Sequence, residues 1–496
     1  MASSNLPKLS PQQLLDQSLE RYQPYLEPQA FKTMLAEIET SPSPTIRTNL
    51  LKADPEVAMP FWKDHYGWET EPINFYPYAW KILNADQSIS KTIEHRMGQY
   101  YIMDAASILP ASLFKLDQKD NQLILDMAAS PGGKTTHIID QTGDHGFVLA
   151  NDASLSRMQA LRVVMQNWGA INYAMVNFPG EKFGDWYPET FDMILLDAPC
   201  SMDNLRPSPS HPVRSITESE RERLSQRQAN LLVSAFKALK VSGQLVYATC
   251  SLAPEEDEAV LDFLIRSFPG RVKIEQVFKD VINAPGLISF EGQDFDLQVK
   301  NSLRIWPQVI GSGGFFAAKI SKLDSVPSNP ETIPSRPFTA TGLNPLPKKI
   351  INFLVDLFNQ YYGFSLEDLR KKYQLGLYNR NETFFLIPDF YINKFQTLPY
   401  HTLGMLLGKQ AGNTFIPSHD FISRFGHHFK TGYFTLSPGM ENEWIRGADI
   451  RGKFDSNYPN GTIVVVRDSL GRNFGSGKVL AQRIRNLLPA RVVQSR

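Results

Sequence analysis

From residue 122 to residue 250, short apolar segments alternate with helix-like segments, and this alternation is what most limits the fold. The apolar segments are QLILDMAA, GFVLAND, YAMVNF, FDMILLDAPC and GQLVYATC. Each is apolar along most of its length, which is typical of strands buried on both faces of a sheet. Strands that alternate with helices predict a doubly wound, mostly parallel α/β sheet, which binds ligands at the carboxyl ends of its strands.

The segments between these strands carry helix boundaries. The longest, residues 217–240, opens on Thr217 and Glu220 in the order of a capping box, and leucines and alanines recur in it at helical spacing. Gly169 directly follows another helix-like segment and is expected to end that helix. Helices of this kind are expected to cover both faces of the sheet.

Length and composition limit the number of domains and the class of protein. A chain of 496 residues is too long for one core, and its net charge is zero. Its two cysteines form no disulfide framework or metal motif, which predicts a reducing compartment and no metal. No apolar run approaches the roughly 18 residues that span a bilayer, and the N-terminus is not of signal-peptide type. We therefore expect a soluble cytoplasmic protein.

The region after the predicted sheet divides into a linker and a basic tail. Residues 322–349 hold six prolines, which is typical of a linker, so that 350–496 should fold separately. Residues 441–496 contain ten basic and five acidic side chains. This excess of positive charge suits nucleic acid, although an ordinary solvated surface is the alternative.

A glycine-rich turn, DMAASPGGKTT at residues 126–136, joins the first strand to a helix. Small residues such as Ala128, Ala129, Gly132 and Gly133 let a ligand approach the backbone, and free N–H groups at a helix start bind polar atoms. The turn is not a Walker P-loop, since Ala128 stands where the first glycine is required, and it lacks the dinucleotide GxGxxG pattern. A turn without any ligand remains an alternative here.

Asp152, at the end of the second strand, favours a ligand. It follows Gly133 by about 20 residues, the spacing at which an acid holds a ribose diol in nucleotide-binding sheets. Because no phosphate-binding motif accompanies it, S-adenosylmethionine is a better candidate than a dinucleotide.

Cys200 and Cys250 follow two further strands, in DAPC and ATC. One such cysteine is most simply a buried structural residue, but two at one edge of the sheet, beside a ribose-binding acid, favour nucleophilic chemistry. A thiolate that adds to carbon-6 of cytosine makes carbon-5 able to accept a methyl group. Asp197 is placed to stabilise the adduct near ring nitrogen 3. A base must then remove the carbon-5 proton, which gives the second cysteine a separate duty.

These motifs, in this order, resemble the Nop/Sun-type RNA (cytosine-carbon-5) methyltransferases. The similarity rests on DMAASPGGKTT, NDAS, FDMILLDAPCS, YATCSL and GGFFAAKI. IRTNLLK and GQYYIMDAASILP resemble the family's N-terminal RNA-binding region. The tail, with WIRGADI and GKVLAQRIRNLLPARVV, resembles the C-terminal PUA-like part of the bacterial subgroup that modifies small-subunit ribosomal RNA.

The resemblance implies a role for each site residue. Cys250 is the expected nucleophile and Cys200 helps to release product, with Asp197 and Lys134 completing the catalytic set. DNA cytosine methyltransferases, the alternative chemistry, place the nucleophile in Pro-Cys but also need a following Gln and a downstream Glu-Asn-Val, which are absent here. For Lys134, a solvated position at the helix start is the alternative. The implied cofactor-binding residues are Ala128, Ala129, Ser130, Pro131, Gly132, Gly133, Lys134, Asp152 and Asp197.

Two positions depart from the family pattern. Met202 stands where a small residue usually follows DAPCS, and Pro179 stands where an acid usually contacts adenine. We therefore expect an altered loop after Cys200, and adenine contacts from Asn177 or from backbone groups. These departures keep open a different class of function, a catalytically weak RNA-binding ribosome-assembly factor.

The resulting prediction is an S-adenosylmethionine-dependent enzyme that methylates carbon-5 of a cytosine through a Cys250 adduct. Small-subunit ribosomal RNA is the expected substrate and partner, with transfer RNA as the alternative, and the protein is expected to be a monomer that needs neither membrane nor metal. The expected segments are an N-terminal RNA-binding region (1–111), a methyltransferase domain (112–322), a linker (323–349), a middle C-terminal domain (350–430) and a PUA-like RNA-binding domain (431–496).

Overall fold

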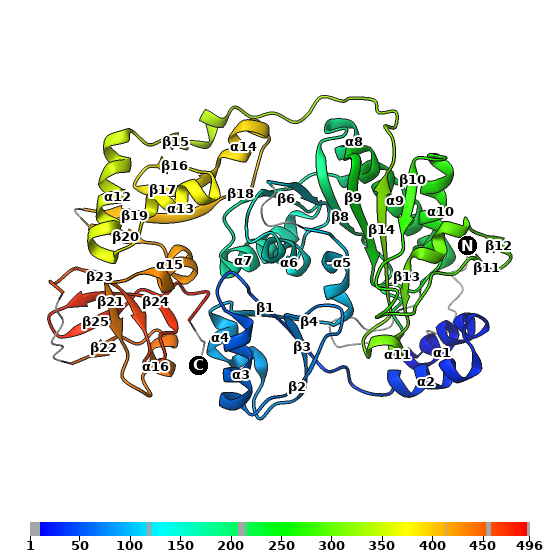
Figure 1. Ribbon diagram of the computed structural model, residues 1–496, viewed down its shortest axis with the longest axis horizontal. Coiled ribbons are helices and arrows are strands. Elements are labelled where there is room, and N and C mark those ends of the chain that lie inside the picture. Colours follow the sequence, from blue (N-terminus) through cyan, green and yellow to red (C-terminus); the bar gives the residue numbers. More distant parts are fainter. Residues whose placement is uncertain are drawn as a thin grey trace, which may run out of the picture.

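The computed structural model describes residues 10–116, 121–206, 214, 216–412, 414–452 and 458–493. At its centre is a sheet with the strand order β10-β14-β9-β8-β5-β6-β7-β18, to which β13 adds by pairing with β14 (Figure 1). The parallel strands are β5 (Leu123–Asp126), β6 (Phe147–Asn151), β7 (Tyr173–Val176), β8 (Phe191–Asp197) and β9 (Leu239–Thr249). The antiparallel ones are β10 (Val272–Glu275), β13 (Leu303–Ile305), β14 (Phe315–Lys322) and β18 (Thr402–Leu403). The predicted doubly wound, mostly parallel sheet is confirmed.

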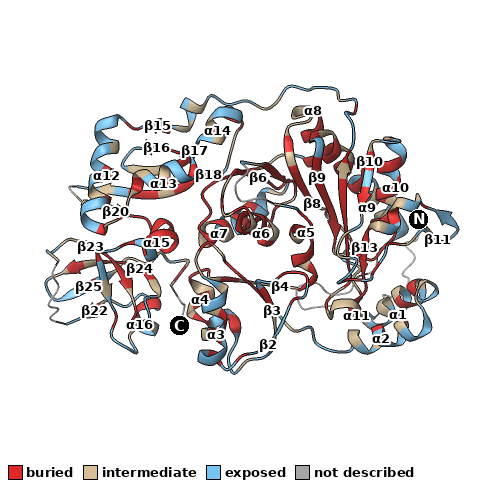
Figure 2. Cartoon of the chain, viewed as in Figure 1, coloured by how far each residue is buried: buried red, intermediate tan, exposed pale blue. Residues whose placement is uncertain are grey.

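The central strands are apolar throughout because both faces of the sheet are covered. Leu125 and Leu149 belong to one hydrophobic cluster, whereas their neighbours Ile124 and Val148 belong to another on the opposite face. Figure 2 shows these strands as a buried centre. The helices around the sheet are α5 (Leu109–Ser112), α6 (Gly133–Gln141), α7 (Met158–Trp168), α8 (Phe183–Trp186), α9 (Glu218–Ala238), α10 (Glu258–Ser267) and α11 (Pro307–Ile310).

The helix boundaries follow the chemistry of their end residues. The Thr217 hydroxyl accepts a hydrogen bond from the Glu220 N–H at 3.2 Å and caps α9. Gly169 ends α7 with a φ of 85°, a left-handed conformation that glycine adopts without a steric penalty. A short hairpin, β11 (Ser289–Phe290) with β12 (Gln293–Asp294), lies between β10 and β13.

The N-terminal region contributes two helices and a separate sheet. Helices α1 (Pro11–Tyr22) and α2 (Pro28–Ile38) precede a sheet of order β2-β3-β1-β4. Its elements are β1 (Thr45–Thr48), α3 (Pro55–Tyr66), β2 (Glu69–Pro72), β3 (Ala79–Asn84), α4 (Ile93–Arg96) and β4 (Tyr100–Met103). Arg47 of β1 is fully buried and forms an ion pair with Asp140 of α6, which fixes this sheet against the central one.

Two further sheets follow the proline-rich segment, which crosses the upper side of the molecule in Figure 1. The first has the order β15-β16-β17-β19-β20 and the second β21-β23-β24-β25-β22. The first includes β15 (Asn344–Pro345), α12 (Lys348–Tyr362), α13 (Leu366–Tyr373), β16 (Leu375–Arg380), β17 (Thr383–Pro388), α14 (Asp389–Lys394), β19 (Met405–Ala411), β20 (Thr414–Pro417) and α15 (His419–Phe425). The second includes β21 (Tyr433–Thr435), α16 (Glu441–Ile445), β22 (Ile450–Arg451), β23 (Ile463–Arg467), β24 (Asn473–Leu480) and β25 (Arg483–Asn486).

The expectation that residues 350–496 fold separately is wrong in one respect. Strand β18 leaves the C-terminal segment and extends the central sheet by pairing with β7. Phe395 and Leu403 belong to the same hydrophobic cluster as the central strands. Composition identified a proline-rich connection, but packing decides whether the connected parts share a core. No helix among the described residues is long and apolar enough to cross a membrane.

Candidate active site

Cys200 and Cys250 meet at the carboxyl edge of the central sheet. Strands β8 and β9 are parallel, with Asp197 opposite Ala248, so the residues that follow each strand lie side by side. The two sulfur atoms are 3.2 Å apart, and both cysteines are free thiols. The structure thus brings together the pair that the sequence placed on one edge.

The surroundings of the two sulfurs make Cys250 the more acidic thiol. The hydrogen bond from Cys200 lowers the pKa of Cys250, and the Lys134 ammonium lowers it further, against the opposing effects of burial and of Asp197. The same hydrogen bond raises the pKa of Cys200 well above its usual range, and burial and the Glu256 carboxylate act in the same direction. Cys250 is therefore the first of the two to ionise, with the Cys200 S–H as its hydrogen-bond donor, and the thiolate is the reactive form of cysteine.

Lys134 and Asp197 form an ion pair beside the sulfurs. The Lys134 Nζ lies 2.7 Å from the Asp197 Oδ2, and the side chains are 17% and 28% exposed. Burial lowers the pKa of Lys134, but Asp197 and the Cys250 sulfur outweigh it, so that the pKa is raised and the ammonium is retained. The Asp197 Oδ1 has no hydrogen-bond partner among the described residues. Lys134 is thus not the solvated lysine of the alternative interpretation.

A buried carboxylate, Glu256, connects the two cysteine-bearing loops. Its Oε2 accepts hydrogen bonds at 2.8 Å from the Ser201 N–H and at 2.9 Å from the Gln228 amide. Its Oε1 accepts one at 3.2 Å from the Ser251 hydroxyl. Ser201 and Ser251 are the residues directly after the two cysteines, so one side chain fixes both loops. The sequence analysis missed Glu256, whose only signal was the acidic run PEEDE shortly after TCS.

The glycine-rich turn is closed by Asp152. The Oδ2 of Asp152 accepts a hydrogen bond from the Ser130 N–H at 3.1 Å, and its Oδ1 accepts one from the Ser154 N–H at 2.8 Å. A carboxylate has further lone pairs for a ribose hydroxyl, so the predicted role stays a prediction. Gly132 has a φ of 114°, and a Cβ on Gly133 would lie 2.9 Å from the Tyr101 ring, so both glycines are required by the backbone.

Asp126, at the end of β5, is a second residue that the sequence analysis missed. Its Oδ2 accepts a hydrogen bond from the Thr135 hydroxyl at 2.6 Å, whereas its buried Oδ1 has no partner among the described residues. Burial raises its pKa to about 7. A buried carboxyl oxygen without a donor fits the α-ammonium group of S-adenosylmethionine, and the turn at 128–133 beside it offers small residues and free N–H groups. The residues present therefore fit this cofactor.

The two departures from the family pattern have local explanations. Met202 has a φ of 63°, a region that favours glycine, and its side chain is 39% exposed, so it does not fill the space around Cys200. The Asn177 amide donates a hydrogen bond at 2.6 Å to the Asp152 carbonyl, so Asn177 supports the turn next to Pro179. Among the described residues, no group of three or more His, Cys, Asp and Glu side chains is arranged to hold a metal ion.

Comparisons with known proteins agree with this arrangement. A family profile described as 16S rRNA methyltransferase RsmB/F matches residues 113–321. The chain is 30% identical over 435 residues to ribosomal RNA small subunit methyltransferase F of Aeromonas salmonicida (strain A449), covering 86% of each chain. It is 30% identical over 455 residues to the protein of the same name from Vibrio atlanticus (strain LGP32), covering 91% of each.

Solved structures share the fold. A methyltransferase homolog protein from Pyrococcus horikoshii is 28% identical, with a TM-score of 0.54 over 64% of this chain and 100% of that chain. NSun6 from Pyrococcus horikoshii, solved with SFG, is 20% identical, with a TM-score of 0.52 over 62% of this chain and 98% of its own. The family profile ends before the C-terminal sheets, so the PUA-like identity of the tail stays a prediction.

Proposed function

Because this chain belongs to the RsmB/F family of ribosomal RNA small subunit methyltransferases, an S-adenosylmethionine-dependent family, we propose that it methylates carbon-5 of a cytosine in small-subunit ribosomal RNA. The observation that carries the proposal is the pair of sulfurs of Cys200 and Cys250, 3.2 Å apart beside the Lys134–Asp197 ion pair. A methyltransferase that acts on an already nucleophilic oxygen or nitrogen has no need of such a pair.

The first step is covalent addition. The Cys250 thiolate attacks carbon-6, a C–S bond forms, and the electron pair of the 5,6 double bond moves toward carbon-5 and ring nitrogen 3. The Lys134 ammonium, which donates a hydrogen bond to the Asp197 Oδ2, offsets the negative charge that develops at nitrogen 3, and a proton passed from it through the Asp197 carboxyl neutralises this nitrogen. Charge stabilisation by such preorganised groups is a large contribution to enzymatic rates.

The second step releases the product. When bound, S-adenosylmethionine supplies the methyl group that carbon-5 takes. Cys250 carries no charge once its sulfur is bonded to carbon-6, so the largest cause of the high Cys200 pKa disappears. Cys200 can then ionise and remove the carbon-5 proton. The C–H electron pair restores the double bond, the C–S bond breaks, and Cys250 leaves as the thiolate that began the cycle.

The cofactor would be held by the turn at 128–133, with Asp126 facing its ammonium group and Asp152 its ribose. Asn177 and backbone groups would serve the adenine, since Pro179 offers no carboxylate. For the RNA, a base within a duplex is out of reach, so the target must be flipped out or lie in a loop. The N-terminal region (1–111) and the segments 350–430 and 431–496, joined by 323–349, are proposed to position the RNA.

The direct test is to identify the product. We expect the purified protein with S-adenosylmethionine to form 5-methylcytidine in small-subunit ribosomal RNA, detected by nuclease digestion and mass spectrometry and located by bisulfite sequencing. Transfer RNA is the comparison substrate. Methylation of transfer RNA alone, or of an atom other than carbon-5, would contradict the proposal.

A further inference from the structure

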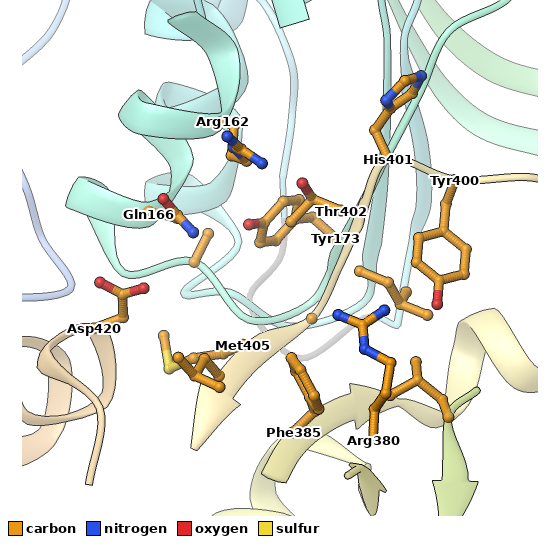
Figure 3. A pocket seen from close by; sticks show the side chains of 15 residues that line it. Arg162, Gln166, Tyr173, Arg380, Phe385, Tyr400, His401, Thr402, Met405 and Asp420 are labelled. Atoms are coloured by element: carbon orange, nitrogen blue, oxygen red, sulfur yellow. The ribbon is translucent and has the colours of Figure 1, made fainter. Parts of the chain in front are cut away.

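A groove lies at the outer edge of the central sheet, where α7 and β18 meet the first C-terminal sheet. It consists of two hollows of about 180 Å³ and about 150 Å³. Both are lined by Arg380, Tyr400 and His401, so the hollows adjoin one another. Figure 3 shows the larger one, with Arg162 of α7 and Arg380 of β16 on different walls. We call this feature the β18 groove.

The β18 groove carries positive charge that is not neutralised by the protein. None of Arg162, Arg336 and Arg380 forms an ion pair with an acid among the described residues, whereas the lining Asp420 is paired with Arg491. An arginine presents a fixed fork of N–H donors that matches the oxygens of a phosphate. The groove therefore has an excess of donors for an anion.

A tyrosine hydroxyl adds a polar group to the larger hollow. Tyr173 is 1% exposed and lines the larger hollow, and Figure 3 shows its side chain among Arg162, Gln166 and Thr402. Among the described residues the Tyr173 hydroxyl forms no hydrogen bond, and it borders the hollow, where a ligand can reach it. A ligand oxygen in the hollow would supply the missing partner.

Part of the positive charge of the basic tail is already paired within the protein. Among its basic residues, Arg472, Arg483 and Arg491 are paired with acids of this chain. Lys453 and Arg496 lie outside the described residues. Charge that is already paired releases fewer counterions on binding a phosphate.

We propose that the β18 groove binds the backbone of a single-stranded RNA segment, with Arg162 and Arg380 on its phosphates. This inference rests on the proposed function, since it names a second contact of the same RNA outside the active site. Each hollow is smaller than the roughly 300 Å³ at which small-molecule pockets begin, so it suits part of a polymer. The two adjoining hollows and the rings of Phe385 and Tyr400 fit a strand whose sugars or bases pack beside its phosphates.

The test is the salt dependence of RNA binding by the full chain. We expect Arg162→Gln with Arg380→Gln to weaken binding of small-subunit ribosomal RNA at least about tenfold. The slope of log K against log salt should fall in magnitude by about 1.4, or about 0.7 for each single-strand phosphate that an arginine no longer neutralises. Tyr173→Phe should weaken binding without changing the slope. The control is Arg266→Gln, which removes a 64% exposed arginine from α10, near the opposite edge of the sheet.

The outcomes separate the groove from the proposed function. Affinity for S-adenosylmethionine should be unchanged in every variant. If the double variant keeps the wild-type salt slope, the proposal that the β18 groove binds RNA is overturned, even where the wild type methylates RNA. A wild type that binds RNA without methylating it overturns the proposed function alone. Binding of cytidine monophosphate tests whether the groove holds a small free anion instead. If the wild type binds this nucleotide tightly and the double variant does not, while the salt slope of RNA binding is the same for both proteins, the assignment of RNA to the groove would also be overturned.

Discussion

At the scale of single residues, the two cysteines differ chiefly through the hydrogen bond between them, which lowers the pKa of Cys250 and raises that of Cys200, and their charged neighbours differ as well. Cys250 is near the Lys134 ammonium, whereas Cys200 is near the Glu256 carboxylate. An opposite charge stabilises a thiolate and a like charge destabilises it. The proposed roles of nucleophile and later base thus follow from the positions of two chemically identical residues.

Asp126 gives a pH-dependent prediction. Its pKa is about 7, raised chiefly by burial, against about 3.9 in an unfolded chain. The folded state without cofactor therefore favours the protonated acid, and the contribution of Asp126 to the free energy of unfolding falls as pH rises from about 4 to about 7. An ammonium group beside Asp126 favours the ionised form, so the affinity for S-adenosylmethionine should increase as pH rises through about 7.

Calorimetric titration across this range checks the prediction for Asp126. Asp126→Asn should weaken binding about 10- to 100-fold at high pH, the effect of losing a hydrogen bond to a charged group, and should remove the pH dependence. Asp144→Asn is the control, since burial raises the pKa of Asp144 to about 6 but its carboxylate accepts hydrogen bonds from Ile171 and Asn172 outside the turn. A pH dependence that persists in Asp126→Asn would contradict the role.

Residues within motifs could be predicted, and residues that act through their neighbours could not. Cys200, Cys250 and Asp197 follow recognisable strands, so their edge of the sheet is readable from the sequence. Glu256 matters because it reaches Ser201, which is 55 positions away in the chain. No local pattern specifies such a contact.

At the scale of elements, the ends of β8 and β9 are held in register by buried charge. Glu256 connects the loops after both strands. Asp257 accepts a hydrogen bond from the Thr249 hydroxyl at 2.6 Å, and the fully buried Arg304 of β13 is paired with Asp257 and Glu258. The acidic run thus holds the strand ends and the active-site loops together.

Replacing Glu256 should disturb the chemistry more than cofactor binding. Glu256→Ala leaves the Ser201 N–H and the Gln228 amide without their acceptor. We expect kcat to fall about 10- to 100-fold, the effect of displacing the catalytic cysteines by about 1 Å. The KM for S-adenosylmethionine should be unchanged. Glu256→Gln keeps an oxygen acceptor but removes the charge, so the alkylation of Cys200 should shift to lower pH.

The matched control is the preceding residue. Glu255 is 34% exposed and pairs with Arg21, so Glu255→Ala should change kcat by less than about twofold. The positioning role of Glu256 would be refuted by two results together. These are equal kcat values for Glu255→Ala and Glu256→Ala, and a pH profile of Cys200 alkylation that does not shift in Glu256→Gln.

Periodicity identified the parallel strands because burial on both faces makes them continuously apolar. The same reasoning did not identify β18, since two residues are too few to show a pattern, and its place is set by the exposed edge of β7. The helix cap at Thr217 was predicted because capping depends on neighbouring residues alone.

At the scale of the whole molecule, the C-terminal segment completes the core of the methyltransferase sheet. Phe395 is 2% exposed, and its ring centroid lies 5.9 Å from that of Phe147 and 6.3 Å from that of Phe191. Composition could separate the proline-rich segment from its neighbours, but the contacts across it depend on tertiary packing. Deletion of 350–496 would therefore expose apolar surface as well as remove the proposed RNA-binding surface.

Phe395→Ala should lower the free energy of unfolding by about 3–5 kcal/mol, the usual effect of truncating a buried phenylalanine. Urea denaturation of the full chain measures this change. Phe353→Ala, at a position of α12 that is 51% exposed, should change stability by no more than about 0.5 kcal/mol. A decrease below about 1 kcal/mol for Phe395→Ala would mean that the segment and the sheet do not share a core.

The assignment of Cys250 as nucleophile and Cys200 as the releasing base is tested most directly by trapping the covalent intermediate. Wild type, Cys200→Ala and Cys250→Ala are each incubated with S-adenosylmethionine and small-subunit ribosomal RNA, and RNA–protein adducts are detected on a denaturing gel and located by peptide mass spectrometry. We predict a stable adduct at Cys250 in Cys200→Ala and none in Cys250→Ala. An adduct at Cys200 in Cys250→Ala, or methylation by Cys250→Ala at the wild-type rate, would contradict the mechanism.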